Sequence, residues 1–279
     1  ANTEALKYPE TRKTDTVDDY FGTKVADPYR WLEDDNSEET KKWVEAQNKV
    51  TYGYLDKIAS RQKIKERLTK IWNFEKMSTP YKKGKYYFYS ENNGIQNQST
   101  LYMREGLNGT PKVLLDPNSF SNDGTVSLSG TSISHDGKYM AYGLSKSGSD
   151  WVEYDVLEIE TGKKLKDHIK WVKFSGVAWQ GNGFYYCRFD APKGSELSSK
   201  KENQKVYFHK IGDEQENDKL IFHDTDHPNR SFSPQVSDDQ QWLLLYSSES
   251  TSGNALMALN LSKPNGSMQV IIDNYDNDY

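Results

Sequence analysis

A repeated pattern of turn, aromatic strand, polar loop and second strand is the feature that most limits the fold of this chain. The pattern begins near Pro80 and occurs four times, as PYKKGKYYFYS, ISHDGKYMAYG, VAWQGNGFYYC and VSDDQQWLLLY. The turn residues that align are Gly84, Gly137, Gly181 and Gln240, which are 53, 44 and 59 positions apart. A unit of about 40 to 50 residues made of short strands is typical of a β-propeller blade. We therefore predict a propeller rather than a β-sandwich, because a sandwich does not repeat one strand order four times.

The turn in SHDGKYMAY has the chemistry that a tight turn before a strand requires. The carboxylate of Asp136 can accept a hydrogen bond from its own turn, and Gly137 can adopt a positive φ. Residues 76–279 are long enough for about four blades, and propellers usually carry roughly four to eight. The last residues, IIDNYDNDY, have the pattern of a loop between blades. We therefore expect further blades beyond this sequence.

The segment before the repeat carries helix signals instead. Asp27 followed by Pro28 has the order of an N-cap and a first-turn proline, and predicts a short helical turn after it. Asn36 and Glu39 have the spacing of a capping box, and the apolar residues that follow recur at helical spacing. These signals predict one helix over about 37–58.

A second helix is predicted over about 60–72. Its apolar stripe among lysines and arginines consists of Ile64, Leu68, Ile71 and Trp72. Both helices have one apolar side, so each is expected to lie against another surface. The tryptophans of this segment are interpreted as packing residues rather than ligand-stacking residues.

Composition excludes two classes of partner. The net charge of −5 and the pI near 5.7 provide no basic field for phosphates, so we expect no nucleic acid partner. With 28% charged residues, a mean hydropathy of −0.92 and no long apolar run, the sequence predicts no membrane span. The single cysteine suits the cytosol and the bacterial periplasm alike. Because the chain begins ANTEALK, like a processed or engineered terminus, we expect the periplasm, with the cytoplasm as the alternative.

The sequence has none of the short motifs G-x-S-x-G, Walker A, G-x-G-x-x-G or H-E-x-x-H. The stretch HDTDHPNR gathers His223, Asp224, Asp226 and His227, which are residue types that bind divalent metals. A polar turn between strands explains this stretch better, and we expect no metal and no cofactor. Cys187 lies in the strand-like FYYCRFD, where it is interpreted as a packing residue.

Two further polar features have simple readings. The acid runs at 33–35 and 213–214 are adjacent in sequence, so they do not flank a sugar as a glycosidase pair must. The segment APKGSELSSKKENQ, residues 191–204, is predicted to be a long polar loop between two strands, placed to overhang a binding surface. No ligand follows from either feature.

The blocks YPETR, VADPYRWLED and WVEAQN, followed by blades that contain WVKFSGVAW, closely resemble the start of the prolyl oligopeptidase family. These serine peptidases cleave short peptides after proline, and the resemblance spans essentially the whole chain. Oligopeptidase B shares the architecture, but the opening block is more similar to the proline-specific branch. The resemblance implies an α/β-hydrolase domain built from both ends of the chain, with a seven-bladed propeller inserted between them. Residues 1–75 would then belong to the hydrolase domain, and residues 76–279 would form about four of the seven blades.

The resemblance also implies where the chemistry lies. The family's Ser, Asp and His, and most of its proline pocket, belong to a carboxy-terminal part that this sequence does not contain, so no residue here inherits a catalytic role. The stretch VKFS places Phe174 at a family aromatic that lines the substrate cavity; the alternative is a phenylalanine in a blade core. In YSSESTSG, Ser248 and Thr251 replace an Arg and a Cys of mammalian members.

The implied partners are short proline-containing peptides and the carboxy-terminal catalytic portion of the same protein. The alternative function is a non-catalytic β-propeller binding module. A binding module has no need of the helical segment that precedes the repeat, and its chain should end by closing a blade. The segment alone is expected to be inactive, because the triad is not in it.

Overall fold

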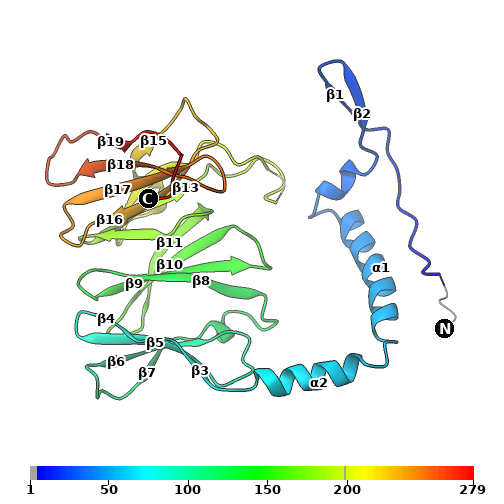
Figure 1. Ribbon diagram of the computed structural model, residues 1–279, viewed down its shortest axis with the longest axis horizontal. Helices are drawn as coiled ribbons and strands as arrows, with labels where there is room; N and C mark the ends of the chain where they lie inside the picture. The colour runs from blue at the N-terminus through cyan, green and yellow to red at the C-terminus, as the bar shows by residue number, and fades with distance from the viewer. Residues whose placement is uncertain (1–4, 198) are drawn as a thin grey trace. The chain divides into compact units, whose positions relative to one another are not determined.

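The computed structural model describes residues 5–197 and 199–279, and these form two compact units. The first unit comprises the described residues up to Asn73 together with those of Pro192–Lys200, and the second comprises the rest. The helices belong to the first unit, and the sheets of the second unit follow one another in chain order (Figure 1). The mainly β fold predicted from the sequence is confirmed.

The first unit opens with a β-hairpin that sequence reasoning missed. Strands β1 (Val17–Tyr20) and β2 (Thr23–Ala26) pair antiparallel around Phe21 and Gly22. Both turn residues have positive φ, 54° and 93°, as in the type I′ turns that suit hairpins. Such turns usually contain Asn-Gly or Asp-Gly, and a phenylalanine at positive φ is uncommon. The Asp19 carboxylate accepts a hydrogen bond from the Gly22 N–H at 2.6 Å and supports the turn.

The predicted cap at Asp27 is wrong. A short 3-10 helix, η1 (Arg30–Glu33), does follow, but its N-cap is Tyr29 and no side chain caps it. The Asp27 carboxylate instead accepts a hydrogen bond from Arg30 Nε at 2.5 Å, and Asp18 binds the same guanidinium. A charge-assisted hydrogen bond from arginine is stronger than one from a neutral backbone N–H. The Asp27 carboxylate therefore binds Arg30 and does not cap the helix.

The two predicted helices are present, with one corrected cap. They are α1 (Glu38–Leu55) and α2 (Arg61–Trp72). The N-cap of α1 is Ser37 rather than Asn36, because the Ser37 hydroxyl accepts a hydrogen bond from the Thr40 N–H at 3.1 Å. The helix ends at Leu55, three residues before the predicted end at residue 58. Neither glycine nor proline follows Leu55 directly, so the sequence does not mark this end.

The apolar stripe predicted for α2 is exposed. Trp72 is 60% exposed, and Ile64, Leu68 and Ile71 are exposed as well. The isolated first unit therefore leaves one side of this helix uncovered. None of the helices in the described residues is long and apolar enough to span a bilayer.

The second unit consists of four antiparallel sheets in the described residues, each made of strands consecutive in sequence. Strand β5 pairs with β3, β4 and β6, and β7 completes the first sheet. The other sheets run β8 to β11, β12 to β15 and β16 to β19, which is the meander of a propeller blade. The strands of the first two sheets are β3 (Lys76–Met77), β4 (Tyr81–Lys83), β5 (Tyr86–Asn92), β6 (Thr100–Glu105), β7 (Lys112–Leu115), β8 (Val126–Ile133), β9 (Tyr139–Lys146), β10 (Val152–Glu158) and β11 (Lys164–Val172). The remaining elements are β12 (Val177–Gln180), β13 (Gly183–Arg188), β14 (Lys205–Lys210), β15 (Lys219–His223), β16 (Ser231–Val236), β17 (Trp242–Ser248), β18 (Ala255–Asn260), β19 (Gln269–Ile272) and the 3-10 turns η2 (Pro117–Ser119) and η3 (Gln215–Asn217).

The repeat seen in the sequence has a structural counterpart in its turns. Gly84, Gly137, Gly181 and Gln240 each lie between the inner strand of a sheet and the next strand, with φ of 57°, 71°, 57° and 56°. Gln240 accepts this left-handed conformation without being glycine. Its side-chain oxygen accepts a hydrogen bond from the Gly181 N–H at 2.8 Å and so links two neighbouring turns. The repeat is therefore one of backbone conformation as well as of residue type.

The hydrogen bonds of the SHDG turn are also repeated. Asp136 accepts from the Ser134 hydroxyl at 2.6 Å and from the Lys138 N–H at 3.0 Å, as the sequence predicted for its own turn. In the fourth sheet, Asp239 accepts from the Ser237 hydroxyl at 2.5 Å. The same Ser-x-Asp hydrogen bond therefore stabilises two of the four turns, those of the second and fourth sheets.

The core lies between successive sheets. Phe88 and Met140 belong to a cluster shared by the first two sheets, and Phe184 belongs to the cluster between the second and third. Leu245 packs with Cys187 between the third and fourth. Since the inner sheets are covered on both faces, a strand such as GFYYCR is almost continuously buried.

Candidate functional site

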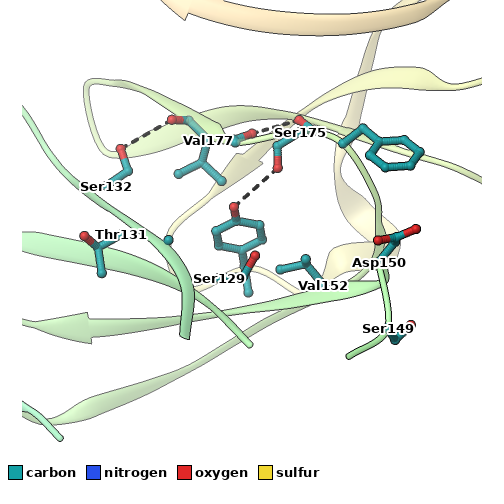
Figure 2. Close-up of a pocket in the computed structure, with 12 residues that line it drawn as sticks. Ser129, Thr131, Ser132, Ser149, Asp150, Val152, Ser175 and Val177 are labelled. Carbon is teal, nitrogen blue, oxygen red and sulfur yellow. Dashed lines mark hydrogen bonds between the residues drawn. The ribbon is translucent and has the colours of Figure 1, made fainter. Parts of the chain in front are cut away.

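A cavity of about 520 Å³ lies where the second sheet meets the third (Figure 2). Its walls come from β8, from the loop that precedes β10, from β10 and from the turn between β11 and β12. Thr131, Asp150, Tyr154 and Phe174 represent these segments in the wall, and Val177, the first residue of β12, completes it. Because the wall draws on two sheets, the cavity exists only when the sheets have packed together.

Polar contacts across the cavity tie the two sheets to each other. The Tyr154 hydroxyl donates to the Ser175 carbonyl at 3.3 Å, and the Ser132 hydroxyl donates to the Val177 carbonyl at 3.3 Å (Figure 2). The Ser175 hydroxyl accepts from the Cys187 N–H at 3.0 Å. Burial raises the pKa of Tyr154, so this phenol is neutral and remains a donor at physiological pH. These three hydrogen bonds hold the two sheets together at the cavity.

Phe174 lies in this wall and does not pack in a blade core. The side chain belongs to a residue that is 65% exposed, and its backbone has a φ of 55°. A bulky residue at positive φ is strained, and such strain persists only where surrounding contacts hold it. Trp171, three residues earlier, also has a positive φ of 64°. The exposure therefore excludes the alternative of a phenylalanine in a blade core, and the residue contributes to the cavity wall.

A group of aromatic and charged side chains surrounds the base of Phe174. Trp151 packs edge-to-face on Trp171 and on Phe189, with ring centres 5.7 and 6.1 Å apart. The ammonium groups of Lys173 and Lys201 lie 5.4 and 4.8 Å from the centre of the Trp151 ring. Burial, and then the charge of Lys173, lower the pKa of Lys201. The cations therefore sit close enough to each other to interact unfavourably.

The stretch HDTDHPNR forms a polar turn after β15, as the sequence favoured. The Asp224 carboxylate accepts hydrogen bonds from the N–H groups of Asp226 and His227, both at 3.2 Å. It also binds His227 Nδ1 and the Arg230 guanidinium, both at 3.0 Å. Among residues 5–197 and 199–279, no group of three or more His, Cys, Asp or Glu side chains has the geometry of a metal site. One carboxylate thus organises the turn.

The other polar features also have structural explanations. Cys187 is fully buried on β13, and burial raises the pKa of its thiol to about 12, so the interpretation as a packing residue is confirmed. Glu214 pairs with Lys166 at 3.0 Å on the surface. The predicted loop 191–204 does connect β13 and β14, and Asp35 accepts a hydrogen bond from its Ser195 at 2.7 Å within the first unit.

Sequence reasoning missed a buried charged network between the second and third sheets. His209 is fully buried, its Nδ1 lies 2.6 Å from Asp218 and its Nε2 lies 2.8 Å from Asp167. Burial acts to lower the pKa of His209, but the hydrogen bonds to the two carboxylates outweigh it and raise the pKa to about 9. Asp167 and His209 are 42 positions apart, so no local pattern could pair them.

The whole of this chain except its first residues matches a known protein family. Residues 8–279 match the family described as prolyl oligopeptidase, N-terminal beta-propeller domain. The chain is 45% identical over 272 residues to a prolyl endopeptidase of Elizabethkingia meningoseptica, which covers 97% of this chain and 38% of that protein. It is 33% identical over 296 residues to a prolyl endopeptidase of Dictyostelium discoideum, covering 86% of this chain and 39% of that protein. The chain therefore spans less than half the length of these relatives.

Solved structures show the same relationship. Prolyl oligopeptidase B from Galerina marginata, bound to a 35mer hydrolysis and macrocyclization substrate, superposes with a TM-score of 0.81 at 30% identity. That match covers 100% of this chain and 43% of the other. The four sheets, their repeated turns and the family match agree with one another. The chain therefore belongs to the prolyl oligopeptidase family and corresponds to the amino-terminal portion of that family's proteins.

Proposed function

We propose that this chain is the amino-terminal portion of a serine-type prolyl endopeptidase that hydrolyses short peptides on the carboxyl side of proline. The observation that carries the proposal is the 45% identity to a prolyl endopeptidase over 97% of this chain. The reaction would be acyl transfer by a Ser-His-Asp triad with an oxyanion hole, supplied by a carboxy-terminal portion. This chain's part is then to restrict access and to contact the substrate.

The proposed division of the chain follows from this function. Residues 1–75 contribute to an α/β-hydrolase domain, and residues 76–279 form about four blades of a seven-bladed propeller. The exposed apolar stripe of α2, with Trp72 60% exposed, supports a covering surface outside this chain. Val270 and Ile271 on β19 are likewise exposed at the last sheet. Both surfaces suit the carboxy-terminal portion as their partner.

Phe174 is the proposed substrate contact in this chain. Its exposed ring at the cavity wall offers an apolar surface to a peptide side chain, and the Tyr154 and Ser132 hydroxyls of the wall are already hydrogen-bonded. In the full-length protein, Phe174→Ala should raise KM about three- to thirtyfold for peptides with a large apolar residue at this subsite. Leu107→Ala is the matched control, because Leu107 is 63% exposed and lies outside the cavity wall. An equal effect of both variants would exclude Phe174 as a substrate contact.

The activity itself is tested with a chromogenic peptide that ends in proline p-nitroanilide. The full-length protein should release p-nitroaniline, and the purified 279-residue chain should not, because the proposal assigns the nucleophile and the base to the carboxy-terminal portion. Binding of the peptide by the full-length protein without any turnover would favour the alternative of a non-catalytic propeller binding module. Turnover by the chain alone would contradict the assignment of the triad to another portion.

The compartment and the stability of the isolated chain complete the proposal. We place the protein in the periplasm, with the cytoplasm as the alternative, and the single buried thiol suits both. Cell fractionation with an antibody against the chain distinguishes them. The isolated chain should associate or aggregate through its exposed apolar surfaces unless the carboxy-terminal portion is present. A monodisperse monomer that unfolds cooperatively, measured by light scattering and calorimetry, would contradict this expectation.

A further inference from the structure

The ring of Phe174 is exposed, yet a buried lysine lies directly beside it. The neighbouring Lys173 is only 8% exposed, although lysine is rarely buried. Its ammonium lies 5.2 Å from the centre of the Phe174 ring and 5.4 Å from the centre of the Trp151 ring. The cation therefore sits between two aromatic faces.

Lys173 also has one charged partner. Its Nζ lies 3.4 Å from Asp150 Oδ2, and Asp150 belongs to the cavity wall. The carboxylate offsets part of the cost of burying the ammonium, and the negative faces of the two rings offset more. The position of Lys173 is thus determined by three contacts that converge from the loop before β10 and from its own turn.

The backbone of the same turn is held from the opposite side. Gln204, which is 1% exposed, donates from Nε2 to the Lys173 carbonyl at 3.0 Å. Its Oε1 accepts from the Phe232 N–H at 2.6 Å, and Phe232 lies on β16 of the fourth sheet. A buried amide therefore anchors the strained turn to a second sheet. The residue directly before Phe174 is therefore anchored through its carbonyl as well as through its side chain.

We propose that Lys173 is a positioning residue, which fixes the Phe174 ring at the cavity wall through its cation–π contact and its ion pair with Asp150. This inference rests on the proposed function for its consequence in catalysis, but the positioning itself is a property of the fold. A fixed ring binds a peptide side chain without first losing its own rotamer freedom. Lys173 thereby sets how strongly the site prefers a large apolar side chain over a small one.

The first test measures the ring directly and needs no activity. A 4-fluorophenylalanine is placed at position 174 of the full-length protein, and its fluorine resonance is compared between wild type and variants. Lys173→Met keeps the length of the aliphatic side chain and removes the charge, so the resonance should move toward that of an exposed, averaging ring. Lys173→Arg should restore the wild-type resonance, because arginine keeps the cation over the ring. A resonance that Lys173→Met leaves unchanged would overturn the proposal.

The second test separates positioning from general loss of charge. Lys201→Met is the matched control, because Lys201 also lies over Trp151, at 4.8 Å, and its charge neighbours that of Lys173. For peptides with a large apolar residue at the subsite, Lys173→Met should raise KM about three- to thirtyfold with kcat nearly unchanged. Peptides with glycine at that place should show no change. An equal loss for both peptides, or the same loss in Lys201→Met, would overturn the role in specificity.

The outcome also distinguishes this inference from the proposed function. If the wild-type protein cleaves no proline peptide but its fluorine resonance responds to Lys173→Met, the endopeptidase assignment fails and the positioning stands. If the protein cleaves proline peptides and the resonance does not respond, the endopeptidase assignment stands and the positioning fails.

Discussion

The buried His209 makes the stability of the propeller dependent on pH in a direction that can be worked out. Both ring nitrogens face carboxylates, at 2.6 Å for Asp218 and 2.8 Å for Asp167, so the imidazole carries two protons and a positive charge. Its pKa of about 9 in the folded protein lies above the ordinary value of 6.5. Folding therefore favours the protonated form of His209. The stabilisation is fully present below about pH 6.5 and is lost as the pH rises through about 9.

The size of the effect follows from the same two values. The difference between a pKa of about 9 and one of 6.5 corresponds to about 3 kcal/mol of unfolding free energy. Removing the histidine costs more at neutral pH, because His209→Gln leaves Asp167 and Asp218 buried without their cation. Breaking a buried ion pair in this way typically costs about 3 to 5 kcal/mol.

At acidic pH, the dependence of stability on pH comes from Asp167. Burial acts to raise the pKa of this carboxyl, but hydrogen bonds from His209 and from the Gly212 N–H lower it below 3.8 overall. Its stabilisation is therefore present above about pH 4 and is lost as the pH falls. The buried network should be most stabilising between these limits.

The assay is urea unfolding of the wild-type protein and the His209→Gln variant between about pH 6 and about pH 10, followed by near-ultraviolet circular dichroism. The difference in unfolding free energy between the two proteins should shrink by about 3 kcal/mol across this range. His227→Gln is the control, because His227 is half exposed and its loss should cost less than about 1 kcal/mol. A wild-type to variant difference that stays constant across the range would refute the charged imidazole.

Three further predictions follow from burial, capping and turn geometry. The Cys187 thiol, whose pKa is about 12, should not react with iodoacetamide at about pH 8 until denaturant is added, as measured by mass spectrometry. Ser37→Ala should destabilise the first unit by about 1 kcal/mol in thermal unfolding, whereas Asn36→Ala should have little effect, and the reverse order would restore the cap predicted from the sequence. Gly137→Ala should cost more stability than Gly148→Ala, since both have a φ near 71° but only at Gly137 would the new Cβ lie 3.1 Å from a backbone oxygen; equal costs would show that strain alone matters.

Much of the propeller could be predicted from local sequence because its signals are local. The turn at Gly137 needs a residue that tolerates positive φ, and Asp136 bonds within its own turn. Both requirements act over fewer than five positions; the positive φ recurs in all four turns, and the aspartate hydrogen bonds recur in two of them. The helices were found for the same reason, although two caps were assigned to the wrong residues. At Asp27 a guanidinium that the sequence pattern did not consider took the capping carboxylate.

The hairpin around Phe21 shows how local reasoning fails within a single turn. Phe21 has a φ of 54°, a conformation that its residue type disfavours. No composition rule identifies such a position, because paired strands and the Asp19 contact hold it there. The pairing of β1 with β2 offsets the conformational free energy that the positive φ of Phe21 costs.

The features of the candidate site also separate into those that local sequence predicts and those that require the fold. Local sequence was enough to predict the blade repeat, the two helices and the place of Phe174 within VKFS, since each depends on neighbours along the chain. The folded structure was needed to show that Phe174 is exposed at a cavity, that Asp150 and Gln204 hold Lys173, and that His209 contacts two buried carboxylates. These arrangements depend on contacts between residues up to 42 positions apart, and such contacts form only when loop closure and sheet packing bring distant segments together.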